Sequence, residues 1–250
     1  MSGHSKWAGI KHKKAIIDAK KGKEFTKVAN MITIAAKEGG NDPKMNFSLR
    51  LAIDKAKAVN MPATNVERAI KRGMGELGGV APEELIYEGY GSAGVAVLLE
   101  VMTDNRNRTA SEVRSIFSKH GGNMADAGAV AYIFEEKGRI SISLDQQKID
   151  REALELAIVE SGADDYEQDG NDFIIYTKKI NLQNVLENLE ENSIIVSDSE
   201  ITYIPKNEIT ISDAEIAKKI IKLVDALEEI EDVTAVHANF DISEEILEKI

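Results

Sequence analysis

Val95-Ala96-Val97-Leu98-Leu99-Glu100-Val101-Met102 is an almost unbroken run of apolar side chains, several of them β-branched. A run of this kind predicts a buried β-strand. Leu85–Tyr90 predicts another strand just before it, and Thr109 with Glu112 forms a capping box that predicts a helix after it. Ala129–Phe134 then predicts a third strand. The order of elements around the apolar run is therefore β-β-α-β, as in α+β folds.

The elements that complete this pattern appear only near the end of the chain. Ser212 with Glu215 predicts the start of a long helix, and Val233–Phe240 predicts the strand that follows it. The residues in between predict a complete βαββαβ unit, made of the strand Ile140–Leu144, the helix Ile149–Ser161, a hairpin that turns at Asp169-Gly170, the helix Asn181–Glu191 and a strand near Ile201–Ile204. We therefore expect one ferredoxin-like α/β domain to be inserted in another, split one.

Three helices with basic outer faces are predicted before residue 80. They are a helix over Lys23–Glu38 that ends at Gly39-Gly40, a helix from an Asp42-Pro43 start to about Val59, and a short helix capped by Thr64 and Glu67. The sequence thus predicts an α+β fold of three domains. These are a basic N-terminal arm and helical domain over 1–80, a split α/β domain over 81–136 plus 208–250, and an inserted βαββαβ domain over 137–207.

Charge is distributed very unevenly along the chain. Residues 1–80 carry 16 Lys and Arg against 7 Asp and Glu, whereas the remaining residues carry 15 against 36, and the formal net charge of the whole is −12. A uniformly acidic protein is repelled by nucleic acid, but a bipolar one can bind a polyanion through its basic end. The alternative is that lysine-rich helices only make the surface soluble. A basic excess over a whole segment favours an anionic partner.

The first residues form a basic, polar arm that contains Trp7 but no apolar run that could fold it. Lysines that neutralise phosphates release counterions, and an aromatic ring can stack on a base. The predicted nucleic-acid-binding residues are His4, Ser5, Lys6, Trp7, Lys11, His12, Lys13, Lys14, Lys20, Lys21, Lys23 and Lys27 in the arm and first helix, Arg50, Lys57, Arg68, Lys71 and Arg72 on the next two helices, and Asn105, Arg106 and Arg108 farther along the chain.

The last three of these residues belong to the segment Thr103-Asp104-Asn105-Arg106-Asn107-Arg108-Thr109, which is predicted to be a loop between a buried strand and a capped helix. Helix N-termini attract phosphate, and two arginines would add further donors. Asp104 and the arginines could instead pair with one another and make the turn rigid. The residues alone leave both interpretations open.

Several classes of protein are excluded or disfavoured. The chain has no cysteine, which excludes disulfides, zinc fingers, iron–sulfur ligation and thiol catalysis. No apolar run approaches the ~20 residues that cross a bilayer, and the basic N-terminus lacks the apolar region of a signal peptide. We expect a soluble cytoplasmic protein that has no membrane partner. The oligomeric state is left open.

Two motifs imitate ligand sites. Gly89-Tyr90-Gly91-Ser92-Ala93-Gly94 fits the dinucleotide pattern, but it runs into a strand where the pattern requires a helix. Asp165 to Gly170 resembles the first half of a calcium loop, yet Tyr176 stands where the bidentate acid is needed. Neither a nucleophile elbow nor a Walker loop occurs. The sequence therefore predicts no enzyme, no cofactor and no metal site.

Several long strings of this sequence together resemble the YebC/PmpR family. They are Gly3-His4-Ser5-Lys6-Trp7, Ile10-Lys11-His12-Lys13-Lys14, Gly22-Lys23-Glu24-Phe25-Thr26-Lys27, the segment Thr103 to Thr109, and Phe117-Ser118-Lys119-His120-Gly121-Gly122-Asn123. The resemblance implies a helical N-terminal domain and two α/β domains around a cleft. It also implies a probable transcriptional regulator that binds promoter DNA, although relatives are linked to translational activation and to relief of ribosome stalling. Phe47-Ser48 departs from the proline-arginine common in the family, and Ser92-Ala93 departs from proline-glycine.

Three functions remain open at this stage. The first is a non-enzymatic DNA-binding transcriptional regulator, and the second is a ribosome-associated factor that binds rRNA. The third is a module that binds a small ligand or a protein. The second and third helices offer mainly lysine and arginine, which contact phosphate and read little sequence. Promoter DNA and structured RNA are therefore both expected partners.

Overall fold

The computed structural model describes residues 21–243 and 246, with side chains from residue 23 onward. The chain divides into two compact units: Glu135–Ile204 form the second, and the residues on either side of this range form the first. The predicted fold class is confirmed, because helices come first and two sheet-containing parts follow. The finer division into three domains stays a prediction.

The first unit begins with three helices, which are α2 (Lys21–Gly39), α3 (Phe47–Ala58) and α4 (Ala63–Gly73). Each helix contributes one apolar stripe to a common small core, formed by Val28, Ile32, Ala35, Ala36, Leu49, Ala52, Ala56, Met61 and Ala69. The outer faces of α3 and α4 are largely polar, as expected for amphipathic helices. By contrast, α2 is buried on most sides, since Asn30, Thr33 and Ile34 are buried as well.

Two of the predicted helix starts in this part are wrong. Asn46, and not Asp42, caps α3, because its Oδ1 accepts a hydrogen bond from the Leu49 amide at 3.0 Å. The amide group of Asn46 also donates to the carbonyl oxygens of Ala35 and Gly40, so the buried side chain joins α2 to α3. Asp42 instead holds a turn, accepting from the Lys44 amide.

The third helix also starts earlier than its predicted capping box. α4 begins directly after Pro62, whose carbonyl accepts from the amides of Asn65 and Val66, and no side chain caps it. Thr64 and Glu67 therefore lie inside α4 and do not form the predicted box. The fixed φ of proline suits a helix start, which accounts for the earlier beginning.

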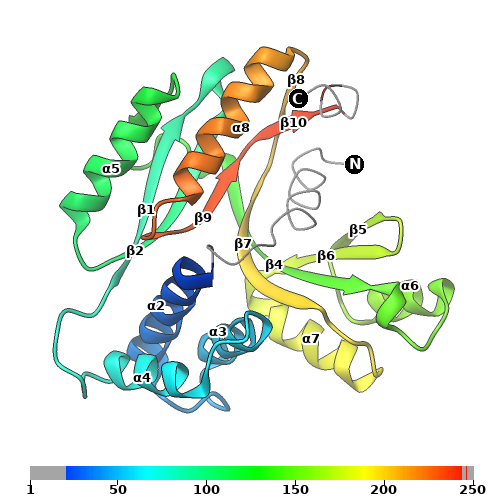
Figure 1. The fold of residues 1–250 in the computed structure, drawn as a ribbon. Coiled ribbons are helices and arrows are strands. Elements are labelled where there is room, and N and C mark those ends of the chain that lie inside the picture. The colour runs from blue at the N-terminus through cyan, green and yellow to red at the C-terminus, as the bar shows by residue number, and fades with distance from the viewer. Residues whose placement is uncertain (1–20, 244–245, 247–250) are drawn as a thin grey trace. The chain divides into compact units, whose positions relative to one another are not determined.

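The first sheet contains β1 (Glu83–Tyr90), β2 (Ala96–Thr103), β3 (Asn123–Ala125) and β9 (Val233–Ala238), in the antiparallel order β3-β1-β2-β9. The helices α5 (Arg106–Lys119) and α8 (Ala214–Glu228) cover one of its faces side by side (Figure 1). Alternate β2 residues from Val97 to Val101 enter this core, and Ala96 and Leu98 on the other face are buried too. Burial on both faces explains the nearly continuous apolar run.

Other boundaries in this part differ from the predictions. Asn105 caps α5, so Arg106 and Arg108 lie in the first turn of a helix and not in a loop that precedes Thr109. Asp213, and not Ser212, caps α8, accepting from the amides of Glu215 and Ile216. The cap of α5 thus lies four residues before the predicted one, which lengthens the helix, whereas the cap of α8 lies one residue after the predicted one.

Two predicted strands are also corrected. Ala129–Phe134 contains a short 3₁₀ turn over Ala131–Ile133, because buried Glu88 draws backbone amides of this segment toward itself. Val233–Phe240 is divided at Asn239, whose Oδ1 accepts from the Ala96 amide at 2.7 Å. The second part becomes β10 (Phe240–Ile242), which pairs in parallel with β8 (Ile209–Ile211).

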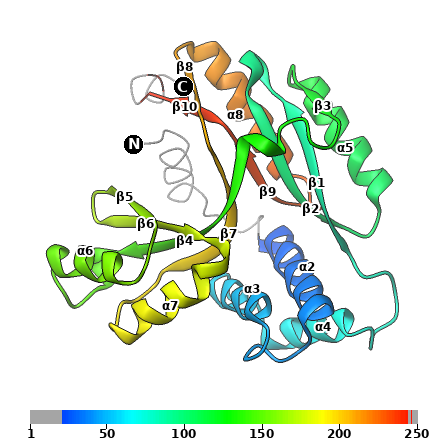
Figure 2. The same cartoon turned by 180° about the vertical axis from the view of Figure 1, so that it is seen from behind.

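The second unit has every element of the predicted βαββαβ pattern, namely β4 (Phe134–Ser143), α6 (Arg151–Glu160), β5 (Asp165–Asp169), β6 (Asp172–Lys178), α7 (Leu182–Glu191) and β7 (Asp198–Pro205). Its strand order is β5-β6-β4-β7, and both helices lie against one face of the sheet (Figure 2). The predicted hairpin is confirmed, but its two-residue turn is Gly170-Asn171, one residue later than predicted, because Asp169 still pairs with Asp172; Gly170 has a φ of 62°.

The chain passes between the units at two neighbouring points. The Lys206 amide donates to the Ile133 carbonyl at 2.8 Å, and Lys206 Nζ donates to the Tyr132 carbonyl at 2.9 Å. The residues just before the second unit are therefore hydrogen-bonded to those just after it.

Candidate nucleic-acid interface

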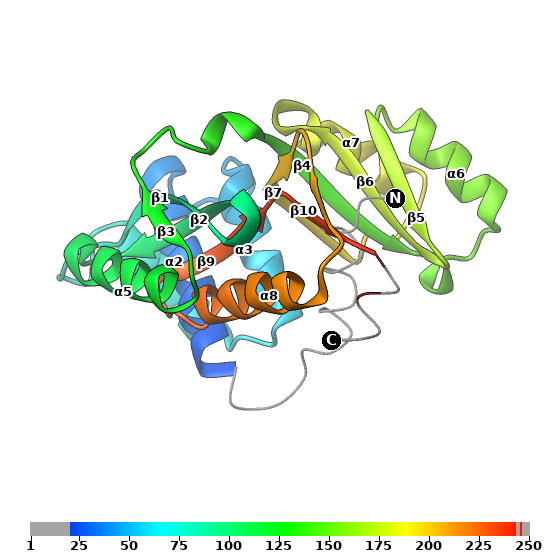
Figure 3. The same cartoon turned by 90° about the horizontal axis from the view of Figure 1, so that it is seen from above.

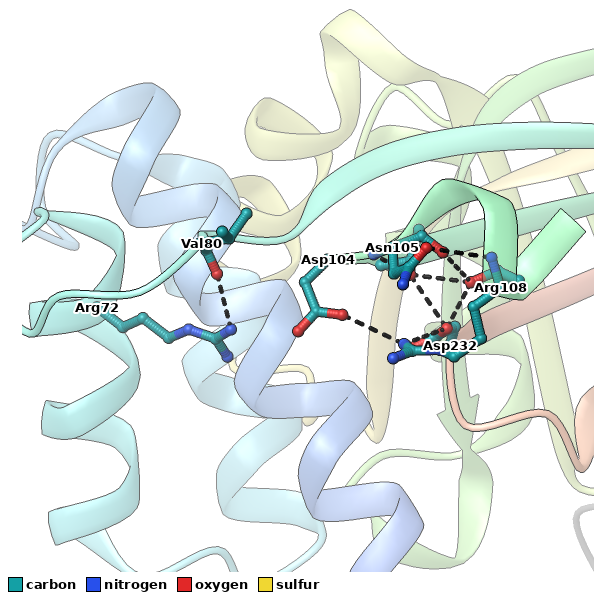
Figure 4. A network of polar contacts seen from close by, with 8 residues as sticks. Arg72, Val80, Asp104, Asn105, Arg108 and Asp232 are labelled. Carbon is teal, nitrogen blue, oxygen red and sulfur yellow. Dashed lines mark hydrogen bonds and ion pairs between the residues drawn. The ribbon is translucent and has the colours of Figure 1, made fainter.

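The outer face of α4 presents free cationic side chains. Ala69 is buried in the helical core, whereas Arg68 and Lys71 are exposed and Arg72 is partly exposed. Among the described residues, neither Arg68 nor Lys71 has a side-chain ion pair or hydrogen bond. Arg72 Nη2 donates to the Val80 carbonyl at 3.0 Å and so closes the glycine-rich exit from α4 (Figure 4). This face can therefore offer at least two unpaired cations to an anionic partner.

The two predicted cations on α3 are partly used within the helix. The Arg50 guanidinium lies over the Phe47 ring, 5.1 Å from its centroid, in a cation–π arrangement. Lys57 Nζ pairs with Asp54 Oδ1 at 2.7 Å, and both side chains are exposed. Since such surface pairs are weak, Lys57 can exchange its partner at little cost.

The first turns of α2 contact the C-terminal end of α8. Lys27 Nζ donates to the Glu228 carbonyl at 2.8 Å, and Lys23 Nζ lies 3.0 Å from both the carbonyl and the Oε2 of Glu229. The last carbonyls of a helix lack partners and attract cations. Burial lowers the pKa of Lys27, and the nearby carboxylates of Glu228 and Glu229 oppose this shift. These contacts favour a structural role for Lys27.

We expect Lys27→Met to lower the free energy of unfolding by about 1 kcal/mol, because the α8 carbonyl loses a charged donor. Nucleic-acid affinity should stay close to that of the wild type. Urea denaturation and a binding titration measure the two quantities. Lys57→Met is the control, with an expected change of at most about 0.5 kcal/mol. A large loss of affinity in Lys27→Met with unchanged stability would contradict the structural role.

A buried carboxylate fixes the segment that contains Arg106 and Arg108. Asp232 Oδ2 accepts hydrogen bonds from Arg108 Nη2 at 2.9 Å, Thr109 Oγ1 at 2.5 Å and Thr103 Oγ1 at 3.1 Å. Arg108 Nη2 also pairs with Asp104 Oδ1, 3.2 Å away. Figure 4 marks both contacts of Arg108 with dashed lines. The pairing of Asp104 with an arginine is therefore present for Arg108, while the role of this segment in binding stays a prediction.

Electrostatics support this arrangement. Burial alone would raise the pKa of Asp232, but hydrogen bonds from Arg108, Thr109 and Thr103 outweigh it, and the net shift is downward. Asp232 is therefore an anion at neutral pH. Arg106 points to a different partner, with its Nε 3.5 Å from Glu83 Oε1, and its side chain stays 65% exposed. Both arginines retain donors that face solvent.

Residues 228–232 contact two of the predicted groups of binding residues, the lysines at the start of α2 and Arg108 at the start of α5. Glu228 and Glu229 contact Lys27 and Lys23, and Asp232, a few residues later, holds Arg108. The end of α8 thus links the start of α2 to the start of α5. Within the described residues, Arg68 and Lys71 on α4 make no hydrogen bond or ion pair with this group and form a separate basic surface.

Comparison with known proteins places the chain in a family. Residues 5–76 match the model described as the TACO1/YebC protein N-terminal domain, and residues 82–240 match the TACO1/YebC second and third domain. The chain belongs to the TACO1/YebC family. The resemblance to YebC that the sequence shows is thereby confirmed.

Relatives of this TACO1/YebC chain match it over their whole length. A probable transcriptional regulatory protein from Halothermothrix orenii is 51% identical and covers 100% of this chain and 99% of its own. Another of the same name, from Sulfurihydrogenibium sp., is 53% identical, with the same coverage. The crystal structure of a conserved hypothetical protein, Aq1575, from Aquifex aeolicus is similar with a TM-score of 0.86 at 48% identity, and the match covers 93% of this chain and 95% of that one.

Part of the predicted site in this TACO1/YebC chain lies outside the described residues. These residues are His4, Ser5, Lys6, Trp7, Lys11, His12, Lys13, Lys14 and Lys20, together with the side chain of Lys21. Their role in binding stays a prediction.

The sequence did not predict two carboxylates that each bind several groups far away along the chain, Asp232 and Glu88. Asp232 is distant in sequence from every group that it binds, and Glu88 lies on a strand where an acid predicts exposure. No local signal identifies either residue.

Proposed function

We propose that this protein is a non-enzymatic regulator of gene expression that binds promoter DNA through its basic helical part. Relatives named probable transcriptional regulatory proteins support the regulatory role. The observation that carries the proposal is the outer face of α4, where Arg68 and Lys71 are exposed and, among the described residues, unpaired. Exposed, unpaired cations can neutralise phosphates without first breaking an internal ion pair.

The distribution of charge supports the same surface. The strong basic excess of residues 1–80 is concentrated in the arm and the three helices, whereas the remainder of the chain is acidic. The basic part can then approach a phosphate backbone while the acidic part is repelled from it. Lysine and arginine on α4 would position the protein on DNA and read little sequence.

Within residues 21–243, no helix is both long and apolar enough to span a bilayer. We assign no cofactor and no metal ion to the proposed function.

The proposal predicts that Arg68→Ala combined with Lys71→Ala weakens DNA binding about 10- to 100-fold, since two phosphate contacts are lost. The slope of log affinity against log salt concentration should become less steep by about 1 to 2, at roughly 0.9 for each contact. Fluorescence anisotropy with a labelled mixed-sequence DNA duplex, titrated at several salt concentrations, measures both quantities.

The matched control is Lys219→Ala combined with Lys222→Ala, which removes two exposed lysines from α8. This variant should bind nearly as the wild type does, apart from a small long-range effect of net charge. Equal losses in the two variants would show a general charge effect and would overturn the α4 interface. A structured RNA is titrated in parallel. Tight binding to that RNA without binding to the duplex would overturn the DNA proposal in favour of the ribosomal alternative.

A further inference from the structure

We infer that the outward face of α5 is a second nucleic-acid contact, which lies along the major groove of duplex DNA. This inference rests on the proposed function and extends it to a surface outside the helical domain.

Charge distinguishes α5 from its surroundings. Its charged side chains are Arg106, Arg108, Arg114 and Lys119 against the single acid Glu112. The neighbouring helix α8 carries as many acids as lysines, and the chain from residue 81 onward is strongly acidic. A basic helix in an acidic region offers a defined place at which a phosphate backbone can approach.

The packing of α5 determines which side chains face outward. Thr109, Val113 and Phe117 are fully buried against the sheet. The positions on the opposite side are exposed and hold the short side chains Ser111, Ser115 and Ser118. Because long side chains are absent from this stripe, a groove wall could come close to the helix backbone.

Longer polar side chains border the serine stripe. Asn107 and Arg114 are exposed beside it, and Lys119 is exposed at the end of the helix. Among the described residues, Arg114 and Lys119 make no side-chain hydrogen bond or ion pair. Figure 3 shows α5 and α8 side by side in one layer, and α8 lies along only one side of α5. The outward face is therefore accessible and carries free donors.

The start of α5 is rigidly held before any partner binds. Asn105 accepts from the Arg108 amide at 3.2 Å, and buried Asp232 holds both Arg108 and Thr109. A surface fixed in this way loses little conformational entropy on binding.

Groove dimensions favour DNA over duplex RNA. The major groove of B-DNA is about 12 Å wide and admits a helix, whereas that of A-form RNA is too narrow for side chains to read. Asparagine and arginine are also the side chains that pair with adenine and guanine edges in the major groove. We therefore expect α5 to confer sequence preference, which the phosphate contacts of α4 do not provide.

The experiment compares two kinds of change on α5 in the full-length chain. Arg114→Ala combined with Lys119→Ala should weaken binding to a mixed-sequence DNA duplex about 10-fold or more. Ser115→Trp leaves the charge unchanged but adds bulk to the stripe, and it should weaken binding by a similar factor. Lys219→Ala with Lys222→Ala is the control for charge, and Ser212→Trp, at an exposed position before α8, is the control for bulk. Circular dichroism and thermal unfolding confirm that each variant is folded.

The possible results separate this inference from the proposed function. Loss of duplex binding in both α5 variants but in neither control supports the inference. Wild-type binding by the α5 variants, together with weak binding by Arg68→Ala/Lys71→Ala, overturns the inference and leaves the proposed function in place. A wild-type chain that binds no DNA overturns both. Weakened binding to structured RNA alone overturns the assignment of duplex DNA as the partner.

Discussion

The Glu88→Ala variant is expected to lose about 3 kcal/mol of unfolding free energy, because buried backbone amides lose their acceptor. Glu88 is 4% exposed. Its carboxylate accepts from the amides of Gly128 and Val130 at 2.6 Å each and from that of Ala131 at 2.8 Å. Gly128 is exposed and can bind water instead, so the cost arises mainly from the other two amides.

Thermal and urea unfolding measure this loss, which corresponds to a fall in Tm of roughly 6 to 12 °C for a chain of this size. Glu84→Ala removes an exposed acid from the same strand and is the control, with an expected change within about 0.5 kcal/mol. A Glu88→Ala variant as stable as this control would show that water replaces the carboxylate at no cost.

Glu88 should also make stability depend on pH. Burial raises its pKa, but the three backbone hydrogen bonds outweigh burial, and the folded-state pKa lies below the ordinary value of 4.5. The stabilisation is therefore fully present above pH 4.5 and is lost as the pH falls through the lower folded-state pKa. Glu88→Gln does not ionise, so its stability should decrease less than that of the wild type over this acidic range.

The second large effect is expected for Asp232→Ala, which should lower the unfolding free energy by about 2 to 3 kcal/mol. The substitution removes the acceptor shared by Arg108, Thr103 and Thr109. This loss of unfolding free energy is smaller than that expected for a fully buried ion pair, because the Arg108 side chain is 53% exposed and remains solvated. Faster amide hydrogen exchange at the start of α5 should accompany the loss.

The Asp232→Asn variant separates charge from geometry. Its amide oxygen can still accept from the threonine hydroxyls, but the charge opposite Arg108 is gone. We expect stability between those of the wild type and Asp232→Ala, measured by urea unfolding. If both variants unfold like the wild type and exchange at α5 is unchanged, Asp232 does not hold this turn.

Local patterns predicted the helices and most strands but not their first residues. The strand β2 and the hairpin between β5 and β6 depend on a few neighbouring side chains, and each occurs within one residue of its predicted position. The start of each helix depends on which nearby side chain reaches the free amides. For α3 and α5 this is an asparagine, Asn46 or Asn105, that binds three residues ahead. The competing candidates, Asp42 and Thr109, fit the same sequence pattern equally well.

The candidate site shows the same limit more clearly. Basic composition predicted Arg68 and Lys71 as exposed cations, because charged residues on amphipathic helices face solvent. It also predicted Lys27 as a phosphate contact, which stays a prediction, but it did not indicate that Lys27 Nζ donates to the Glu228 carbonyl at the end of α8. Contacts between residues so far apart along the chain depend on tertiary packing, which a single sequence does not reveal.

The hydrogen bond between Lys206 and Ile133 has a consequence for how this architecture can change. Since the departing and returning strands already touch at the base of the second unit, a tight turn suffices to close the chain there. Removal or exchange of residues 135–204 would then leave every residue of the first unit's hydrophobic core in the chain. Insertions are best tolerated where chain ends lie close together. Relatives can thus differ in this acidic segment while the chain of the first unit remains closed at the same point.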